Sequence, residues 1–336
     1  MLINIIKKAL FSAAVILLLL STWFSFEFYI TPKCSPKTQF VNIESGTSVK
    51  QIAQILQEQG VISKKRAFLL GYQIFFFFKS LKAGEYAFQL PLSTKKVLST
   101  LTEGKTFLHS ITFPEGLTRK EIAFHLQSLL FIDEEDFLKT SADTEPIILL
   151  DKKASNLEGY LFPETYHFSK GTQAKDVVSV MVSQFKQVFS EKWQRRAEEI
   201  GMTTREVVIL ASLIEKETSL SEEKELVSAV FHNRLKINMK LDCDPTIIYA
   251  LKQEERYNGR LRTKDLKYDS LYNTYIYPGL PPGPIANPGK DSLKAALYPA
   301  DEKFLYFVSK NDGSHHFSLT FREHQNAVNK YQKRKR

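Results

Sequence analysis

The sequence predicts an α+β fold in which helices outnumber strands, preceded by an N-terminal transmembrane helix. Three observations carry this prediction. The 336 residues are 43% hydrophobic and 25% charged, which is typical of globular proteins and is long enough for an anchor plus two or three packed regions. Residues 9–26 contain no charged residue. Short strand patterns and amphipathic helical patterns then follow in mixed order, as in α+β proteins.

The first element is the uncharged run at residues 9–26, which follows Lys7 and Lys8. Its 18 residues approach the roughly 20 that cross a bilayer as a helix. Trp23 and Tyr29 stand where interfacial aromatic residues are enriched, and no small-residue cleavage site follows. We therefore expect an uncleaved anchor at 9–30, a cytoplasmic tail at 1–8 and the body of the protein outside the cytoplasm.

A proline-containing linker at 31–40 leads to an internal repeat. "VNIESGTSVKQIAQIL" from Val41 aligns without a gap with "ITFPEGLTRKEIAFHL" from Ile111, and Gly46 pairs with Gly116. Each copy predicts a short strand, a glycine turn, a Ser or Thr N-cap and an amphipathic helix. A second helix follows each copy, at 64–78 and 134–140. This is the outline of a LysM-like module, with a purely structural βαα unit as the alternative, and we assign 41–155 to this N-terminal region.

The remaining elements complete the predicted fold. Strands are expected at 82–88 and 106–113, with a helix at 94–102 between them. The region 156–330 is predicted to be one catalytic domain, followed by a basic tail at 331–336. Its expected elements are a long helix at 172–200, a helix around residue 215, a helix at 221–235, an ordered loop at 272–289, a helix at 292–297, paired strands at 304–309 and 315–319, and a final helix.

Charge and motifs exclude several classes of protein. The net charge is +9, but the C-terminal tail supplies five of these charges and Lys7 and Lys8 two more, so the body is nearly neutral and no nucleic-acid partner is expected. Cys34 and Cys243 are the two cysteines, too few for a disulfide framework or a zinc site by themselves. The HExxH, P-loop and G-x-S-x-G patterns do not occur, and we expect neither metal nor cofactor.

The segment "LASLIEKETS", residues 210–219, places two glutamates after an almost entirely apolar stretch. On a helix Glu215 lies over Ser212, whereas Glu217 is about 200° further round, so the two carboxylates cannot converge on one atom. One of them can act while the other pairs with a cation. Apolar surroundings at Glu215 would favour the protonated carboxyl that a general acid needs. The alternative is a salt-bridged glutamate at a helix end.

Five motifs occur in the same order along the second half of the chain, and together they resemble the YceG-like (MltG) family of endolytic murein transglycosylases. With the anchor and the repeat, the similarity extends over essentially the whole chain. The motifs are "LEGYLFPETY", "LASLIEKET", "FHNRLKINMKLDCDPTIIYAL", "YNTYIYPGLPPGPIANPGKDSLKAAL" and "YFVSKNDGSHHFS".

The resemblance implies that Glu215, the first glutamate of the family's L-A-S-x-x-E-K-E-T motif, is catalytic. It also implies cleavage of the MurNAc–GlcNAc β-1,4 bond within nascent peptidoglycan, with the sugar's own C6 hydroxyl closing a 1,6-anhydro ring in place of water. Such cleavage is expected to terminate glycan elongation. If water were the nucleophile, a second carboxylate would be needed, and Glu158 and Glu164 are the first candidates. Substrate contacts are expected from Glu158, Tyr160, Glu164, Ser212, Asp242, Asn273 and Tyr275. Asp242 departs from the glutamine that is common in the family.

The resemblance further implies a single-pass protein of the inner (cytoplasmic) membrane that acts on glycan strands, with peptidoglycan synthases as candidate partners. The competing hypothesis is a non-catalytic, membrane-anchored scaffold that binds peptidoglycan.

Overall fold

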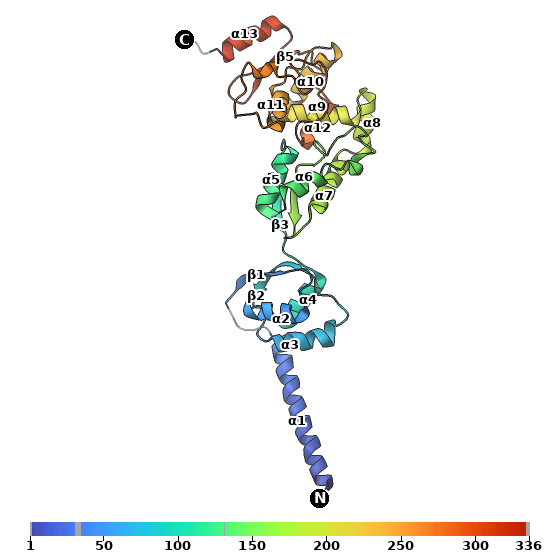
Figure 1. Ribbon diagram of the computed structural model, residues 1–336, viewed down its shortest axis with the longest axis vertical. Coiled ribbons are helices and arrows are strands. Elements are labelled where there is room, and N and C mark those ends of the chain that lie inside the picture. The colour runs from blue at the N-terminus through green and yellow to red at the C-terminus, as the bar shows by residue number, and fades with distance from the viewer. Residues whose placement is uncertain (1, 31–34, 131, 334–336) are drawn as a thin grey trace. The chain divides into compact units, whose positions relative to one another are not determined.

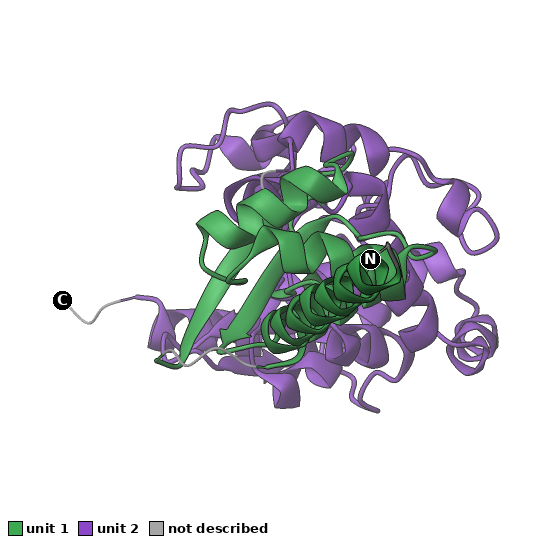
Figure 2. Cartoon of the chain, turned by 90° about the horizontal axis from the view of Figure 1, so that it is seen from below, with its two compact units in different colours: residues 1–110, 167–171 green, residues 111–166, 172–336 purple. Residues whose placement is uncertain are grey.

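The computed structural model describes residues 2–30, 35–130 and 132–333, and its fold is mixed α+β. The chain divides into two compact units (Figures 1 and 2). Unit 1 comprises residues 1–110 and 167–171, and unit 2 comprises residues 111–166 and 172–336. The chain therefore passes from one unit to the other three times.

Unit 1 combines the N-terminal helix with a small α+β body. Its two longer strands pair antiparallel from Lys37 opposite Leu90 to Ile43 opposite Gly84. The elements are α1 (Leu2–Tyr29), β1 (Lys37–Ile43), α2 (Val49–Glu58), α3 (Lys65–Gly71), a π-helical turn η1 (Tyr72–Phe76), β2 (Gly84–Leu90) and α4 (Thr94–Glu103).

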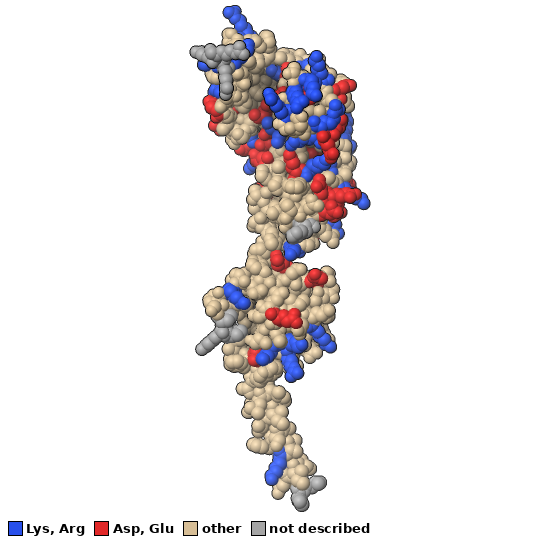
Figure 3. Space-filling model, turned by 60° about the vertical axis from the view of Figure 1, so that its left-hand side comes forward, with Lys and Arg blue, Asp and Glu red and all other residues tan. Residues whose placement is uncertain are grey.

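Helix α1 is long and apolar enough to cross a membrane, by length and composition, and it is the one such helix among the described residues. Figure 3 shows it as an almost uncharged rod. Its last turn is part of the folded body, because Phe28 is fully buried in the core of unit 1. A Cβ atom at Gly71 would lie 2.1 Å from the Phe28 ring, so the ring packs where α3 carries no side chain.

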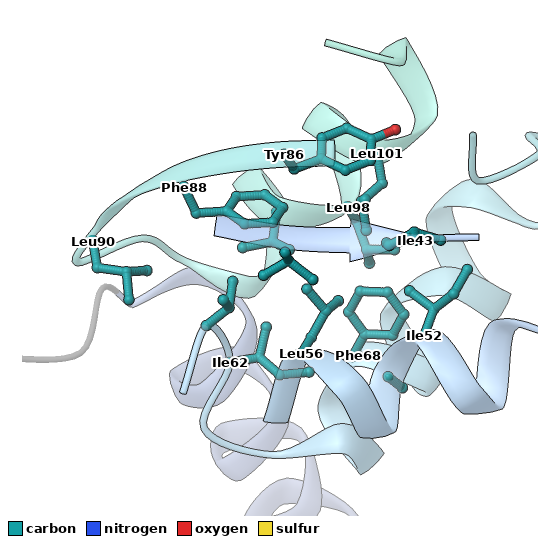
Figure 4. Packing of buried hydrophobic residues seen from close by; sticks show 14 of the residues in the cluster. Ile43, Ile52, Leu56, Ile62, Phe68, Tyr86, Phe88, Leu90, Leu98 and Leu101 are labelled. Carbon is teal, nitrogen blue, oxygen red and sulfur yellow. The ribbon is translucent and has the colours of Figure 1, made fainter. Parts of the chain in front are cut away.

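The core of unit 1 lies between the two-stranded sheet and helices α2, α3 and α4 (Figure 4). Alternate residues of the strands point inward, as period-2 burial requires, and the helices contribute one apolar face each. Labelled members are Ile43, Ile52, Leu56, Ile62, Phe68, Tyr86, Phe88, Leu90, Leu98 and Leu101.

The predicted repeat is confirmed at the level of local structure. Gly46 and Gly116 both adopt left-handed backbone angles, with φ of +84° and +78°, in turns that precede a helix. Ser48 forms a capping box with Gln51, and Thr118 exchanges the same pair of hydrogen bonds with Glu121. A strand, this turn and two helices make up each copy.

The two copies nevertheless belong to different units, which differs from the predicted region 41–155. Strand β3 (His109–Thr112) pairs with β4 (Thr165–Phe168), which lies far along the chain. The second copy's α6 (Glu134–Thr140) packs on α5 (Arg119–Leu130) and on a helix of the predicted catalytic region. The second copy therefore packs within unit 2 and not against the first copy.

Unit 2 is mostly helical. Its further elements are η2 (Glu145–Ile147), α7 (Ala174–Val188), α8 (Glu191–Glu199), α9 (Thr204–Glu217), α10 (Ser221–Lys236), α11 (Asp244–Gln253), η3 (Asp265–Lys267), α12 (Lys290–Leu297), β5 (Tyr306–Ser309), β6 (His315–Ser318) and α13 (Phe321–Tyr331). The predicted strand pair is confirmed as the antiparallel β5 and β6. The stretch at 272–289 contains no helix or strand, as predicted.

Three predicted boundaries are wrong. The single helix at 172–200 is two helices, because Phe189 leaves helical geometry and Ser190 adopts an extended conformation that starts α8. Phe189 is fully buried, and its ring contacts Phe185 of α7 and Trp193 of α8. The linker predicted at 31–40 ends earlier, because β1 already begins at Lys37; its residues 31–34, including Cys34, lie outside the described part. The predicted tail at 331–336 begins inside α13, and residues 334–336 are not among those described.

Candidate active site

Helix α9 carries Glu215 close to its C-terminal end. A capping box between Thr203 and Glu206 starts the helix, and every residue from Val207 to Ile214 is buried. This confirms the predicted helix around residue 215 and shows that its apolar stretch is buried on all sides. The helix therefore holds Glu215 on a rigid support, one turn from the point where the backbone leaves helical geometry.

The carboxylate of Glu215 accepts hydrogen bonds from three groups. Lys224 Nζ on α10 lies 3.2 Å from each carboxylate oxygen. The backbone N–H of Gly289 and the hydroxyl of Ser292 donate to Oε2 at 2.9 and 2.6 Å. The expectation of apolar surroundings is therefore wrong for the carboxylate itself, although it holds for the helix below it. The side chains of Glu215 and Lys224 are only 7% and 4% exposed.

Two of these donors belong to the start of helix α12. Gly289 is its N-cap residue and Ser292 lies in its first turn. Backbone N–H groups at a helix start lack partners within the helix and favour a negative group. Helix α12 packs closely on α9 and on α10, so the three elements fix the carboxylate from different sides.

A second carboxylate, Glu115, shares the same lysine. Its Oε2 lies 3.4 Å from Lys224 Nζ, and its side chain is 48% exposed. Burial and the neighbouring Glu215 carboxylate raise the pKa of Glu115, and Lys224 opposes them. A Cβ atom at Gly289 would lie 1.8 Å from Glu115 Oε1, so the absence of a side chain at Gly289 makes room for this carboxylate.

Glu115 was not predicted as a site residue, although one feature of the sequence pointed to it. Glu115 stands just before Gly116 in the second copy of the repeat, where the first copy has Ser45. The turn is held in place because Gly116 N donates to Asn287 O and Lys216 Nζ donates to Gly116 O. The equivalent turn of the first copy has nothing within 4 Å of a Cβ built at Gly46. A difference between two otherwise matching turns was the available clue.

Glu217 has different neighbours, as the helical spacing predicts. Burial raises its pKa to about 7; a hydrogen bond with Cys243 opposes this, and the nearby Asp244 adds to it. His315 and Arg234 are the cationic groups that act on it electrostatically. Of the two glutamates, it is Glu215 whose carboxylate directly contacts a lysine.

Of the predicted site residues in "LEGYLFPETY", two are buried and one is exposed. Glu158 is 4% exposed and accepts from Arg119 N and from Asn287 Nδ2, both at 3.0 Å; burial raises its pKa to about 7. Tyr160 is fully buried and donates to Asp151 at 2.7 Å. Glu164 is exposed beside the β3–β4 pair. The geometry thus gives Glu158 and Tyr160 packing roles, and it does not gather the three at Glu215.

The other predicted contacts are also partly structural. Ser212 is fully buried, and its hydroxyl accepts from Ile285 N at 3.1 Å, which ties the long loop to α9. Asn273 is fully buried and donates to Leu266 O and Tyr268 O. These two side chains shape the loop that leads to Gly289. Their part in substrate binding stays a prediction that this geometry does not favour.

Tyr275 and Asp242 are more accessible. The Tyr275 hydroxyl donates to Asp244 at 2.7 Å. Asp242 is 39% exposed as a side chain and lies 3.4 Å from Arg234 Nη1. Burial raises the pKa of Asp242, and Arg234 opposes this effect. Both side chains stay candidates for contacts with a ligand. Within residues 2–30, 35–130 and 132–333, no group of three His, Cys, Asp or Glu residues is arranged to hold a metal ion.

Comparison with known proteins shows the family to which the chain belongs. A curated endolytic murein transglycosylase of Bacillus subtilis is 35% identical over 318 residues, covering 89% of this chain and 86% of its own length. One from Streptococcus pneumoniae D39 is 29% identical over 330 residues, and the match spans 58% of that longer protein. The crystal structure of a YceG-like protein from Listeria monocytogenes matches with a TM-score of 0.59 and 32% identity, over 86% of this chain and 98% of that one. The model of the YceG-like family matches residues 41–330, and the chain therefore belongs to the YceG-like family.

Proposed function

We propose that this protein is a membrane-anchored endolytic murein transglycosylase that cuts the β-1,4 bond between MurNAc and GlcNAc within nascent strands. The names of the B. subtilis and S. pneumoniae relatives support the activity. The observation that carries the proposal is the fixed carboxylate of Glu215, held by an ammonium, a hydroxyl and a helix-start N–H. A catalytic acid has to be positioned within hydrogen-bond reach of the atom that it protonates, and these contacts provide the positioning.

In the proposed reaction Glu215 first acts as an acid. The protonated carboxyl donates to the glycosidic oxygen, and the bond between that oxygen and C1 of MurNAc breaks. The resulting carboxylate then accepts the proton of the MurNAc C6 hydroxyl as its oxygen bonds to C1. The products are a GlcNAc hydroxyl and a 1,6-anhydro-MurNAc end, so no water is consumed. New ends of this kind would terminate glycan elongation.

Lys224 and Glu115 have a defined part in this cycle. When Glu215 is protonated, Lys224 loses its carboxylate partner there but keeps Glu115 at 3.4 Å. Since an unpaired buried charge is costly, Glu115 keeps the Lys224 ammonium paired while Glu215 carries a proton. Glu115 thus supports the change of charge that acid–base catalysis requires.

Hydrolysis at the same site is the second candidate function. The observation that favours it is again Glu115, a half-exposed carboxylate whose partner lysine is also the partner of Glu215. A carboxylate in such a position could activate water, in the arrangement that two-carboxylate glycosidases use. It is a better-placed candidate for the second carboxylate than Glu158, which is buried, or Glu164, which lies at the β3–β4 pair.

The anchor and unit 1 complete the proposal. Helix α1 would hold the protein in the cytoplasmic membrane, with residues 1–8 inside the cell and the body outside. The order β1, α2, α3, β2, with an antiparallel strand pair, supports a LysM-like module that grips glycan. Peptidoglycan synthases, which supply nascent strands, are the proposed protein partners.

The test is to incubate the full-length chain, in detergent micelles, with uncrosslinked glycan strands and to analyse the products by mass spectrometry. Transglycosylation gives internal cuts and anhydro ends that are one water lighter than hydrolysis products. Glu215→Gln should abolish cleavage, with a loss of roughly 10²–10⁴-fold, and Glu217→Gln should retain it. Reducing ends would select hydrolysis. Binding of strands without any cleavage by the wild type would select the non-catalytic scaffold.

A further inference from the structure

Four consecutive phenylalanines, Phe75–Phe78, have no place in the proposed chemistry. They lie at and just after the π-helical turn η1. Phe77 and Phe78 are 64% and 98% exposed, and the neighbouring Ile74 is 60% exposed. Large apolar side chains exposed together mark an interaction surface. We call Ile74, Phe75, Phe77 and Phe78 the aromatic patch.

The aromatic patch is continuous with the end of helix α1. The Phe75 ring stacks on Phe28 with centroids 5.4 Å apart, and it meets the edge of Tyr29 at 6.3 Å. Phe24, one turn earlier, stacks on Phe28 and packs against the same core. The patch therefore lies beside the last turn of the helix and is joined to it by direct ring contacts.

This contact fixes the level of the patch relative to a bilayer. The uncharged run 9–26 is about 27 Å long as a helix at about 1.5 Å per residue, close to the roughly 30 Å of the hydrocarbon core. Glu27 is the first charged residue after it. Phe28 and Tyr29 then stand at the edge of the hydrocarbon, and Phe75 touches both of them. Tyrosine is enriched at this depth in membrane proteins, and phenylalanine is among the apolar residues that interfacial segments bury at the boundary between headgroups and acyl chains.

The charge of the residues around the aromatic patch is also suited to a membrane surface. Residues 35–110 contain ten basic and four acidic residues, whereas residues 111–329 contain 28 basic and 32 acidic ones. Lys95 Nζ lies over the Tyr29 ring and Lys79 Nζ over the Phe76 ring. Figure 3 shows basic side chains gathered on the end of unit 1 from which α1 projects. Basic residues close to an anionic leaflet are attracted to it, and the attraction falls off within a Debye length.

The turn that presents the rings is also held in position. The Tyr72 hydroxyl donates to Lys79 O at 2.9 Å, and Lys79 N donates to Phe76 O at 2.8 Å. These bonds close the segment from Tyr72 to Lys79 on itself. The exposed rings are therefore part of an ordered loop.

We infer that the aromatic patch inserts into the headgroup region of the bilayer that α1 crosses, so that unit 1 docks flat on an anionic membrane surface through a second contact. This inference rests on the proposed anchoring by α1. The ring contacts, the position of Glu27 and the excess of basic residues each select a lipid surface as the occupant. A second contact beside the anchor prevents unit 1 from tilting about the end of the helix.

The test uses the full-length chain, with Cys34→Ser, in vesicles that contain phosphatidylglycerol. Single cysteines are introduced as Leu18→Cys in α1, Phe78→Cys in the patch and Leu149→Cys in unit 2, and are labelled with an environment-sensitive fluorophore. Phe78 and Leu149 are 98% and 91% exposed, so neither change disturbs a core, and the native Cys243 is buried. Spin-labelled lipids and aqueous iodide serve as quenchers.

The expected result is that the probe at 78 is quenched several-fold more by lipids spin-labelled near the headgroup than the probe at 149, and is protected from iodide. The probe at 18 should respond to deep spin labels. If the probe at 78 is exposed to water while the probe at 18 lies in the bilayer, the inference is overturned but the anchoring by α1 holds. Aqueous probes at both positions would overturn the anchor and the inference together. A probe at 78 that is protected from iodide but not quenched by lipid would mean that protein covers the patch, which also overturns the inference.

Discussion

Lys224 Nζ lies 3.2 Å from both carboxylate oxygens of Glu215, and both side chains are almost completely buried. The two residues are nine positions apart and sit on consecutive helices, α9 and α10. The same ammonium reaches Glu115. Lys224 is therefore shared by two carboxylates, and each of its two contacts can be altered separately.

Removing the ammonium should destabilise unit 2. Lys224→Met leaves a buried carboxylate without its cation, which costs about 3–5 kcal/mol when a buried pair is broken. Adding Glu215→Gln should recover much of this loss, because the uncompensated charge is gone. Urea unfolding followed by Trp193 fluorescence, with Trp23 replaced by Phe, measures both variants. Purely additive effects of the two substitutions would contradict direct coupling.

Gly289→Ala should move Glu115 without disturbing Glu215. The backbone at Gly289 has φ of −78°, which alanine adopts readily, and its N–H still donates to Glu215. The new methyl group would overlap Glu115 Oε1, a half-exposed group that can swing away. We expect the rate of cleavage to fall on the order of tenfold, corresponding to about 1.4 kcal/mol, and we expect the same loss in Glu115→Gln. The double variant should be no slower than either single variant; a multiplied loss would mean that Gly289 acts by another route.

Glu217 should make stability depend on pH. Its pKa rises from 4.5 to about 7 on folding, so the folded chain binds more protons than the unfolded chain between these values. Its contribution is therefore greatest at low pH and is lost as the pH rises through 7. Glu217→Gln should remove this loss and be more stable than the wild type at pH 8, by up to about 3 kcal/mol. Parallel stability curves for the two proteins between pH 5 and 8 would refute this, and Glu198→Gln on the exposed face of α8 is the control.

Asn287→Ala should loosen the whole site. Its side chain accepts from Gly159 N and Leu161 N and donates to Leu117 O and Glu158, and the residue is 1% exposed. Alanine leaves several buried groups without partners, at a cost of about 3 kcal/mol or more in the free energy of unfolding. The Trp193 unfolding curve reports this loss. Asn233→Ala, which removes two bonds at a partly exposed position, should cost clearly less.

Local signals in the sequence predicted local structure well. The two glycine turns, their capping boxes and the buried helix below Glu215 follow from neighbouring residues, and all are confirmed. The break at Phe189 was not predicted, because the apolar spacing continues through it. The assignment of the second repeat copy to unit 2 was not predicted either, because it depends on β3, which pairs with a strand more than fifty residues away.

Within the candidate site, Glu215 was singled out from the sequence, but the residues that contact its carboxylate were not. Glu215 stands out because a carboxylate follows an apolar helix, and the resemblance to a known family agreed. Its partners come from other segments: Glu115 precedes it by one hundred positions, and Ser292 follows it by seventy-seven. No spacing rule relates such positions. Tertiary packing of α12 on α9 and α10 brings them together.

The ring of Phe28 above Gly71 has a practical consequence for anyone who prepares this protein without its hydrophobic helix. A truncated chain that starts at residue 39 lacks this ring and the first two residues of β1. The space above Gly71 that the ring fills would be left open, and Phe75, which stacks on Phe28, would lose a packing partner. A shortened protein that begins before Phe24 keeps that part of the core. Solubility is then better obtained by replacing exposed leucines of α1 than by deleting the helix.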